Sequence, residues 1–168
     1  LALAFQTYMR FKHIFAVPRP MELSPQIQPM IPTPGHGALP SGHATEAFVI
    51  AHVLEALMNA DGSDGGNGTK CREQLQRLAA RISINRTVAG LHYPVDSAAG
   101  QVLGTALGAF LVARSTGGKR QHRSFDGRSF TGADGAPKDF RLHDNTGSID
   151  ANGGELTMPK APLLEWLW

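Results

Sequence analysis

The sequence lacks several features that would narrow its class at once. Cys71 is the only cysteine, so no disulfide can form within the chain; this fits a reducing compartment without excluding an exported protein. The net charge of +2 at neutral pH is too small to suggest a nucleic-acid partner. Any positive charge that serves a function must therefore be local. With 42% hydrophobic residues among 168, the chain can still build one domain with a core.

Long hydrophobic runs are also scarce. The best candidate for a membrane span, residues 97–113, carries no charge but is short and rich in Gly and Ala, so we expect a buried helix of a soluble protein and no membrane span. Its stripe of small residues, Gly100, Gly104 and Gly108, permits close helix packing. The chain starts at Leu1, already inside a helical pattern. We therefore expect an upstream region to be missing, and the compartment, cytoplasmic or exported, stays open.

Four helical stretches account for most of the sequence, and strand-like alternation is rare. They run over about residues 1–15, 41–62, 71–89 and 94–114. Seven prolines between residues 18 and 40 predict a long connection without regular structure. Beyond residue 115, Gly, Asp, Arg and Ser dominate. We therefore predict a helical domain over residues 1–115 that carries the site, followed by an extended tail over residues 116–168.

Three short clusters contain residues suited to chemistry. They are Lys12, six residues, Arg19-Pro20; then Pro40-Ser41-Gly42-His43; then Arg86, five residues, His92, three residues, Asp96. Taken singly, each has an ordinary structural explanation. Lys12 and Arg19 fit solvated surface charges, and Ser41 fits a helix cap. His92 fits a core histidine, and Asp96 fits a favourable charge in the first turn of a helix.

Helical geometry sharpens the interpretation of the third cluster. In a regular helix, Arg86 falls on nearly one line with Leu75, Ala79 and Ile82. It therefore extends the apolar stripe that should face the core. A buried guanidinium is costly unless a negative group meets it. A protein carboxylate is one such partner, and a bound oxyanion, whose geometry the guanidinium fork matches, is the other.

Two predicted helix starts favour the oxyanion. The segment Ser41-Gly42-His43 opens the second helix, and His92 lies just before the fourth. Helix N-termini offer unpaired N–H groups and partial positive charge. The glycine also lets the backbone approach an anion closely. The cations of the three clusters would then complete one anion site.

Together, the clusters resemble the full signature of the superfamily that unites vanadium-dependent haloperoxidases with PAP2-type acid phosphatases, and most closely that of bacterial vanadium haloperoxidase-like proteins. Their order matches from Lys12 to Asp96. One departure is Asn85, where the phosphatases usually have Ser before the arginine. The resemblance implies an all-α helical bundle. Four helices are fewer than the family uses, so missing N-terminal helices or a partner in a homo-oligomer would supply the rest.

The resemblance also implies a role for each residue. The oxygens of a bound vanadate or phosphate would be held by Lys12, Arg19, Ser41, Gly42 and Arg86. His92 would bind vanadium through its imidazole or attack phosphorus. Asp96 would orient His92, and His43 would be the general acid or base on the opposite side.

Vanadate resembles the transition state of phosphoryl transfer, so this signature serves two chemistries. His36 lies seven residues before His43; vanadium bromoperoxidases are similar in placing there a second histidine that is implicated in halide handling. The helix from His43 also carries Glu46 and Glu55, unlike the apolar helices of many membrane-embedded PAP2 phosphatases. We therefore favour a vanadium-dependent haloperoxidase. It would oxidise halide, bromide rather than chloride, with hydrogen peroxide and halogenate an organic acceptor.

Two alternatives stay open. The first is an acid phosphatase that hydrolyses a phosphate monoester through a phosphohistidine at His92. The second is a non-catalytic oxyanion-binding module. A divalent metal site at His36, His43 and His92 is conceivable, but the surrounding cations oppose it. We predict no role for His13, His52, His122 and His143.

Overall fold

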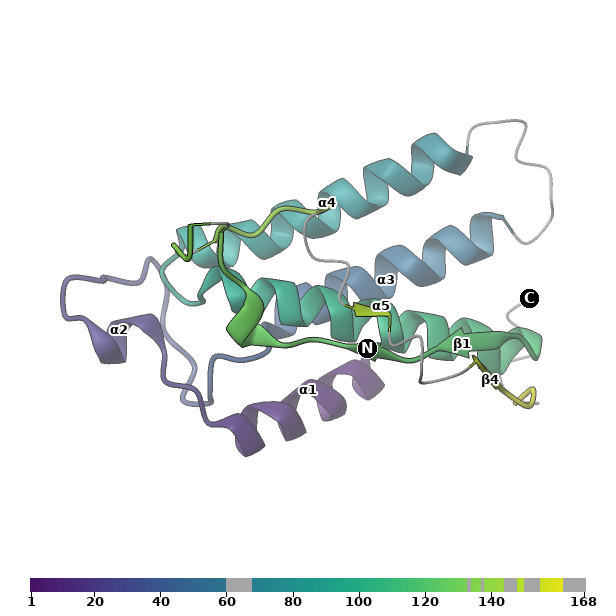
Figure 1. Ribbon diagram of the computed structural model, residues 1–168, viewed down its shortest axis with the longest axis horizontal. Coiled ribbons are helices and arrows are strands. Elements are labelled where there is room, and N and C mark those ends of the chain that lie inside the picture. The colour runs from purple at the N-terminus through teal and green to yellow at the C-terminus, as the bar shows by residue number, and fades with distance from the viewer. Residues whose placement is uncertain (60–67, 133, 137, 144–147, 150–154, 162–168) are drawn as a thin grey trace.

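The computed structural model describes residues 1–59, 68–132, 134–136, 138–143, 148–149 and 155–161. Three long helices lie side by side (Figure 1), namely α3 (Gly42–Met58), α4 (Gly68–Val88) and α5 (Pro94–Thr116). A shorter helix, α1 (Ala2–Phe15), packs against α3 and α5. The all-α class and the four predicted helices are therefore confirmed, with α4 starting three residues earlier than expected.

The helix boundaries follow from local chemistry. The side chain of Ser41 accepts a hydrogen bond from the Ala44 N–H at 3.4 Å and so caps α3. The fixed φ of Pro94 suits the first turn of α5. This helix ends at Gly117, whose φ of 73° is a left-handed conformation that glycine adopts without strain.

The glycine stripe of α5 brings this helix close to α3. A Cβ atom on Gly104 would lie 2.4 Å from the Thr45 carbonyl oxygen, and one on Gly108 would lie 2.7 Å from the Cβ of His52. Neither position can therefore carry a side chain without moving α3. By length and composition, α5 is the one helix in the described ranges that could cross a membrane, and 44% of its apolar window is buried within the protein.

The proline-rich connection contains one element that we did not predict. A short helix, α2 (Pro20–Leu23), interrupts the segment between residues 18 and 40, so the prediction of no regular structure there was wrong. Its first residue is Pro20, and a proline in the first helical turn forfeits no hydrogen bond because that N–H has no helical partner. The residue that caps this helix is Arg19, which places a predicted site residue at a fixed point.

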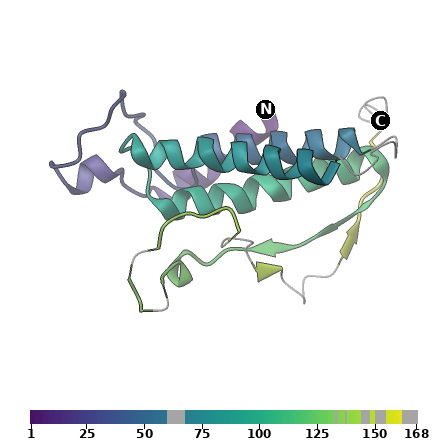
Figure 2. The ribbon, with the colours of Figure 1, turned by 90° about the horizontal axis from the view of Figure 1, so that it is seen from above.

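After α5 the chain returns along the bundle (Figure 2). Two small antiparallel pairs form, β1 (Lys119–Gln121) with β4 (Glu155–Thr157) and β2 (Arg123–Ser124) with β3 (Ser148–Ile149). A 3-10 turn covers Gly127–Ser129. Phe140 is buried in the core, with its ring 6.5 Å from that of Phe48. This segment therefore adds to the core of the helical body; the apolar end predicted to dock, residues 163–168, lies outside the described residues.

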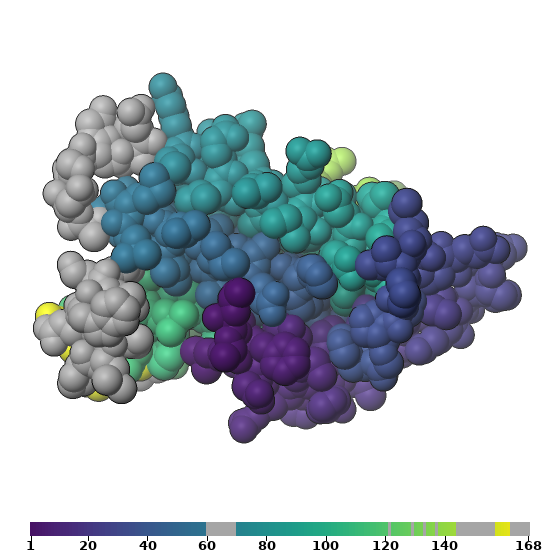
Figure 3. All heavy atoms as spheres, turned by 180° about the vertical axis from the view of Figure 1, so that it is seen from behind, coloured from purple at the N-terminus to yellow at the C-terminus, as the bar shows by residue number. Residues whose placement is uncertain are grey.

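Helices α1, α3 and α4 reach the surface on the face shown in Figure 3. Each leaves large apolar side chains at least one-third exposed, among them Leu3, Phe5, Ile50, Leu54, Leu78 and Ile84. The homo-oligomer suggested by the sequence stays a prediction.

Candidate active site

Helix α1 carries Lys12 into the interior. The lysine follows buried Tyr8 by one turn on the same face and is only 1% exposed. Its Nζ donates hydrogen bonds to the carbonyl oxygens of Gly37 at 2.9 Å and Ala38 at 3.0 Å. Burial, followed by repulsion from Arg19, lowers the Lys12 pKa to about 7. The ammonium is therefore held in place but titrates near neutral pH.

Arg19 is the most extensively bonded cation of the site. Its Nη1 donates to the Leu91 carbonyl at 2.8 Å and to His92 Nε2 at 3.0 Å. Its Nε donates to the carbonyl oxygen of His36 at 3.1 Å, and Nη2 contacts His36 Nδ1 at 3.1 Å. Because a guanidinium can only donate, His92 Nε2 acts as an acceptor; His36 Nδ1 lies between Arg19 Nη2 and the Gly37 carbonyl oxygen, which is 3.3 Å away. Arg19 thus joins the proline-rich connection to the start of α5.

His92 precedes the first turn of α5, and Asp96 lies within it. The imidazole Nδ1–H donates to Asp96 Oδ2 at 2.9 Å, and the same oxygen accepts the Tyr93 N–H at 3.0 Å. Burial lowers the His92 pKa to about 4, although Asp96 acts in the opposite direction. The ring is therefore neutral at physiological pH, with its proton on Nδ1. Asp96 fixes the tautomer that presents the Nε2 lone pair to an electrophile.

The start of α3 lies against the start of α5. The Ser41 N–H donates to the Asp96 carbonyl oxygen at 2.9 Å. Gly42 packs on the ring of Tyr8, where a Cβ atom would lie 2.9 Å from two ring carbons, so glycine is required. Within the described part of the chain, the N–H groups of Gly42 and His43 donate no hydrogen bond. They are available to an anion at a helix N-terminus.

Arg86 occupies the last turn of α4. As predicted, it continues a stripe in which Ala79 is buried and Leu75 and Ile82 pack on the core. Its Nε is buried without a hydrogen-bond partner, and burial lowers the pKa of the guanidinium. No described residue pairs with this cation. Since a desolvated cation without a counter-charge is unfavourable, Arg86 is the strongest indication of a missing anion.

The groups of the three clusters act on one another electrostatically. Burial lowers the pKa of His43, and Arg86 from α4 and Lys12 from α1 lower it further. Arg86 also lowers the pKa of Arg19, and Lys12 acts on His92. The structure thus brings the three sequence clusters together at the N-terminal ends of α3 and α5. Three cations, free N–H groups and a neutral imidazole suit a tetrahedral oxyanion.

A divalent metal fits this site poorly. No group of three or more His, Cys, Asp and Glu side chains within the described residues could hold one. The histidines His36, His43 and His92 instead lie among cations that lower the pKa of each ring.

Two residues of the site were missed by sequence reasoning. The hydroxyl of Tyr8 donates to Glu46 Oε1 at 3.1 Å, and Glu46 opposes the cations that lower the pKa of His43. Tyr8 precedes Lys12 by four residues, and Glu46 follows His43 by three. This helical spacing was the signal that could have identified both, since such residues share one face with a predicted site residue.

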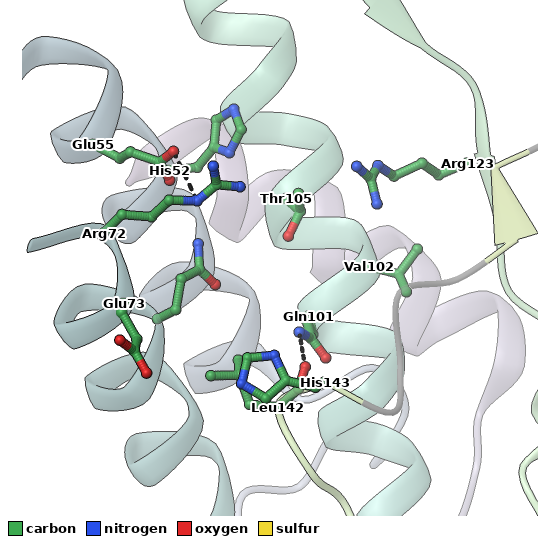
Figure 4. Close-up of a pocket in the computed structure, with 11 residues that line it drawn as sticks. His52, Glu55, Arg72, Glu73, Gln101, Val102, Thr105, Arg123, Leu142 and His143 are labelled. Carbon is green, nitrogen blue, oxygen red and sulfur yellow. Dashed lines mark hydrogen bonds and ion pairs between the residues drawn. The ribbon is translucent and has the colours of Figure 1, made fainter. Parts of the chain in front are cut away.

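A separate cavity of about 520 Å³ lies between α3, α4, α5 and the segment that follows α5 (Figure 4). Its charged walls are largely self-paired, since Arg72 Nε contacts Glu55 Oε1 at 3.1 Å. The Gln101 amide donates to the Leu142 carbonyl at 3.0 Å. His52 and His143 line this cavity, whereas none of the predicted site residues does. It is therefore distinct from the oxyanion site.

Two comparisons with known proteins bear on the family of this chain. The family model described as "PAP2 superfamily" matches residues 1–118, which include all three clusters. A vanadium-dependent bromoperoxidase from Ascophyllum nodosum is 27% identical over 119 residues. That alignment covers 60% of this chain but only 21% of the relative, so the chain spans about a fifth of that protein's length.

Proposed function

This chain belongs to the PAP2 superfamily, and from that membership and the geometry of its site we propose that it is a vanadium-dependent haloperoxidase. It would use hydrogen peroxide to oxidise halide, bromide rather than chloride, and halogenate an organic acceptor. The observation that carries the proposal is the convergence of Arg19 and Lys12 on the neutral imidazole of His92, with the unpaired Arg86 acting on Arg19 and His43. The superfamily contains phosphatases and haloperoxidases, which supports an enzymatic role.

The donors of the site fit vanadate. His92 Nε2 carries a lone pair that could bind the metal, because Nδ1 bears the proton. The oxygens would be held by Lys12, Arg19, Ser41, the Gly42 N–H and Arg86. Phosphate, which has the same shape and charge type, could occupy the same place. When bound, vanadate would supply a Lewis acid that polarises peroxide for attack by halide without changing its own oxidation state.

Arg19 must change its hydrogen-bond partner when an oxyanion binds, and His43 must be able to accept a proton. Arg19 Nη1 now donates to His92 Nε2, so this N–H would turn to an oxyanion oxygen and release the lone pair. His43, at the start of α3, keeps part of its surface open to solvent, and partial burial together with Arg86 lowers its pKa below the usual value. A neutral imidazole there can accept a proton from hydrogen peroxide.

His36 supports the haloperoxidase over the phosphatase. Its ring contacts the same guanidinium that bonds to His92, and burial lowers its pKa. His36 Nδ1 lies 3.1 Å from Arg19 Nη2 and 3.3 Å from the Gly37 carbonyl oxygen, and the tautomer with its proton on Nε2 would let the ring donate to a halide. The bromoperoxidase of Ascophyllum nodosum, with which the chain aligns, adds weight to this choice.

The second candidate is a PAP2-type acid phosphatase. The same Nε2 lone pair of His92 would attack the phosphorus of a phosphate monoester, and the P–O bond to the alcohol would break. His43 would protonate the leaving alkoxide, and water would then release phosphate from the phosphohistidine. A third candidate, a non-catalytic oxyanion-binding module, would need the cations but not the acid–base histidine.

A paired assay distinguishes these functions. The protein is incubated with vanadate, bromide and hydrogen peroxide while halogenation of a dye is followed, and separately with a chromogenic phosphate ester. We expect halogenation that depends on vanadate. Phosphate release without such halogenation would establish the phosphatase, and vanadate binding without turnover in either assay would establish the binding module.

The role of His36 is tested by His36→Ala. We expect bromide oxidation to weaken by about 10-fold, the effect of one lost hydrogen bond to a charged group, with a smaller change in vanadate affinity. His13→Ala, at an exposed histidine of α1, is the matched control. Unchanged bromide kinetics in His36→Ala would remove its proposed role.

A further inference from the structure

Helix α3 places a carboxylate one turn beyond the acid–base histidine. Glu46 follows His43 by three residues, and residues at this spacing share one face of a helix. Glu46 is half-buried and accepts a hydrogen bond from the Tyr8 hydroxyl at 3.1 Å. The carboxylate is therefore held in place on the same face as His43.

Tyr8 connects this carboxylate to two other parts of the site. The tyrosine is 8% exposed, and its ring lies against the backbone of Gly42 in the first turn of α3. One turn further along α1, Lys12 enters the oxyanion site. Burial, aided by Glu46, raises the Tyr8 pKa to about 12, so the hydroxyl stays a donor. The Tyr8–Glu46 hydrogen bond thus joins α1 to α3 where both contribute to the site.

The charges around His43 explain why a carboxylate is useful there. Arg86 from α4 and Lys12 from α1 disfavour protonation of the imidazole, as does burial, and Glu46 favours it. Among the described residues, Glu46 is the one carboxylate that acts on His43 in this way. Without it, Arg86 and Lys12, which suit an oxyanion, would also suppress the proton-accepting ability of the histidine.

We propose that Glu46, anchored by Tyr8, is a positioning residue that tunes the proton affinity of His43 against the cations of the oxyanion site. The inference rests on the proposed function, in which His43 exchanges a proton with substrate. It adds two residues, Tyr8 and Glu46, that lie outside the three sequence clusters. It also explains why α1 must contact the first turn of α3 through a tyrosine.

The test is the titration of the His43 ring by proton NMR in the wild type and in Glu46→Gln. We assign the His43 signal by its absence from His43→Gln. Because Glu46 raises the pKa of His43, we expect the midpoint to move to lower pH in Glu46→Gln. Glu46→Asp, which keeps the charge, should recover part of the shift. Glu55→Gln, nine residues further along α3 and paired with Arg72, should leave the midpoint unchanged.

Turnover gives a second reading of the same effect. The limb of the pH–rate profile that reports His43 should move to lower pH in Glu46→Gln. At a fixed pH on that limb, the rate should change by about two- to tenfold, since a shift of one pKa unit is a tenfold change in the ratio of protonated to neutral His43. A His43 midpoint identical in the wild type and folded Glu46→Gln would overturn the inference. A shifted midpoint in a protein without halogenating activity would support the inference and refute only the haloperoxidase.

Discussion

Replacing Arg86 by methionine should raise the stability of the protein without oxyanion and lower its affinity for vanadate. Arg86 has a buried Nε without a partner, and its charge disfavours the cation of Arg19. Methionine keeps most of the apolar stem that continues the stripe of Leu75 and Ile82. We therefore expect Arg86→Met to be more stable than the wild type when no oxyanion is bound, and to bind vanadate poorly.

The magnitudes follow from ordinary hydrogen-bond energetics. A buried donor without a partner costs about 1–3 kcal/mol, and because Arg86 is only half-buried we take about 1 kcal/mol. For a chain of this size that corresponds to a rise in Tm of about 2–4 °C. A hydrogen bond between a cation and an anion contributes about 1.5–3 kcal/mol, so vanadate affinity should fall by about 10- to 150-fold.

Thermal unfolding without oxyanion and equilibrium titration with vanadate measure the two quantities. Arg81→Met serves as the control, because Arg81 is an exposed residue of the same helix and should change neither. A loss of stability in Arg86→Met, with vanadate affinity retained, would refute the reasoning. It would mean that Arg86 pairs with a protein group and does not hold the oxyanion.

Two further predictions concern the other groups of the site. In Asp96→Asn, the amide oxygen can still accept the His92 and Tyr93 N–H groups but carries no negative charge. The hydrogen bond that orients His92 should therefore weaken, and vanadate affinity measured by titration should fall by about 10-fold, whereas Asp126→Asn at the surface should have no effect. Lys12, with a pKa of about 7, is charged below neutral pH and loses its charge as the pH rises. The affinity of the wild type for phosphate should therefore fall above pH 7 more steeply than that of Lys12→Arg, whose charge persists. Calorimetric titrations that give the same pH dependence of affinity in both proteins would contradict this.

Much of the local structure could be predicted from the sequence. The serine that caps α3 and the proline that opens α5 set helix boundaries through contacts within one turn. The inward face of α4 followed from the spacing of Leu75, Ala79, Ile82 and Arg86. The glycine stripe of α5 indicated close helix packing, and α3 lies against it. These features depend on periodicity and on hydrogen bonds between near neighbours, and both can be recognised from residues that lie close together in the sequence.

Other features could not be predicted because they join distant parts of the chain. Arg19 meets Leu91 and His92 across more than seventy residues, and no spacing rule links those positions. The short helix α2 was missed because the prolines around it predict a break, although Pro20 itself suits a first turn. Phe140 is buried in the core, although it belongs to a segment whose composition predicted only an extended tail.

For the site itself, the sequence alone indicated which residues to propose for an oxyanion, because the three clusters resemble the signature of a known superfamily in residue type, order and spacing. Only the tertiary structure decided how those residues behave. The neutral His92, the titratable Lys12 and the unpaired Arg86 are states set by burial and by charges from other helices. Desolvation and Coulomb interactions act through space. These properties therefore arise only when α1, α3, α4 and α5 pack together in the folded protein.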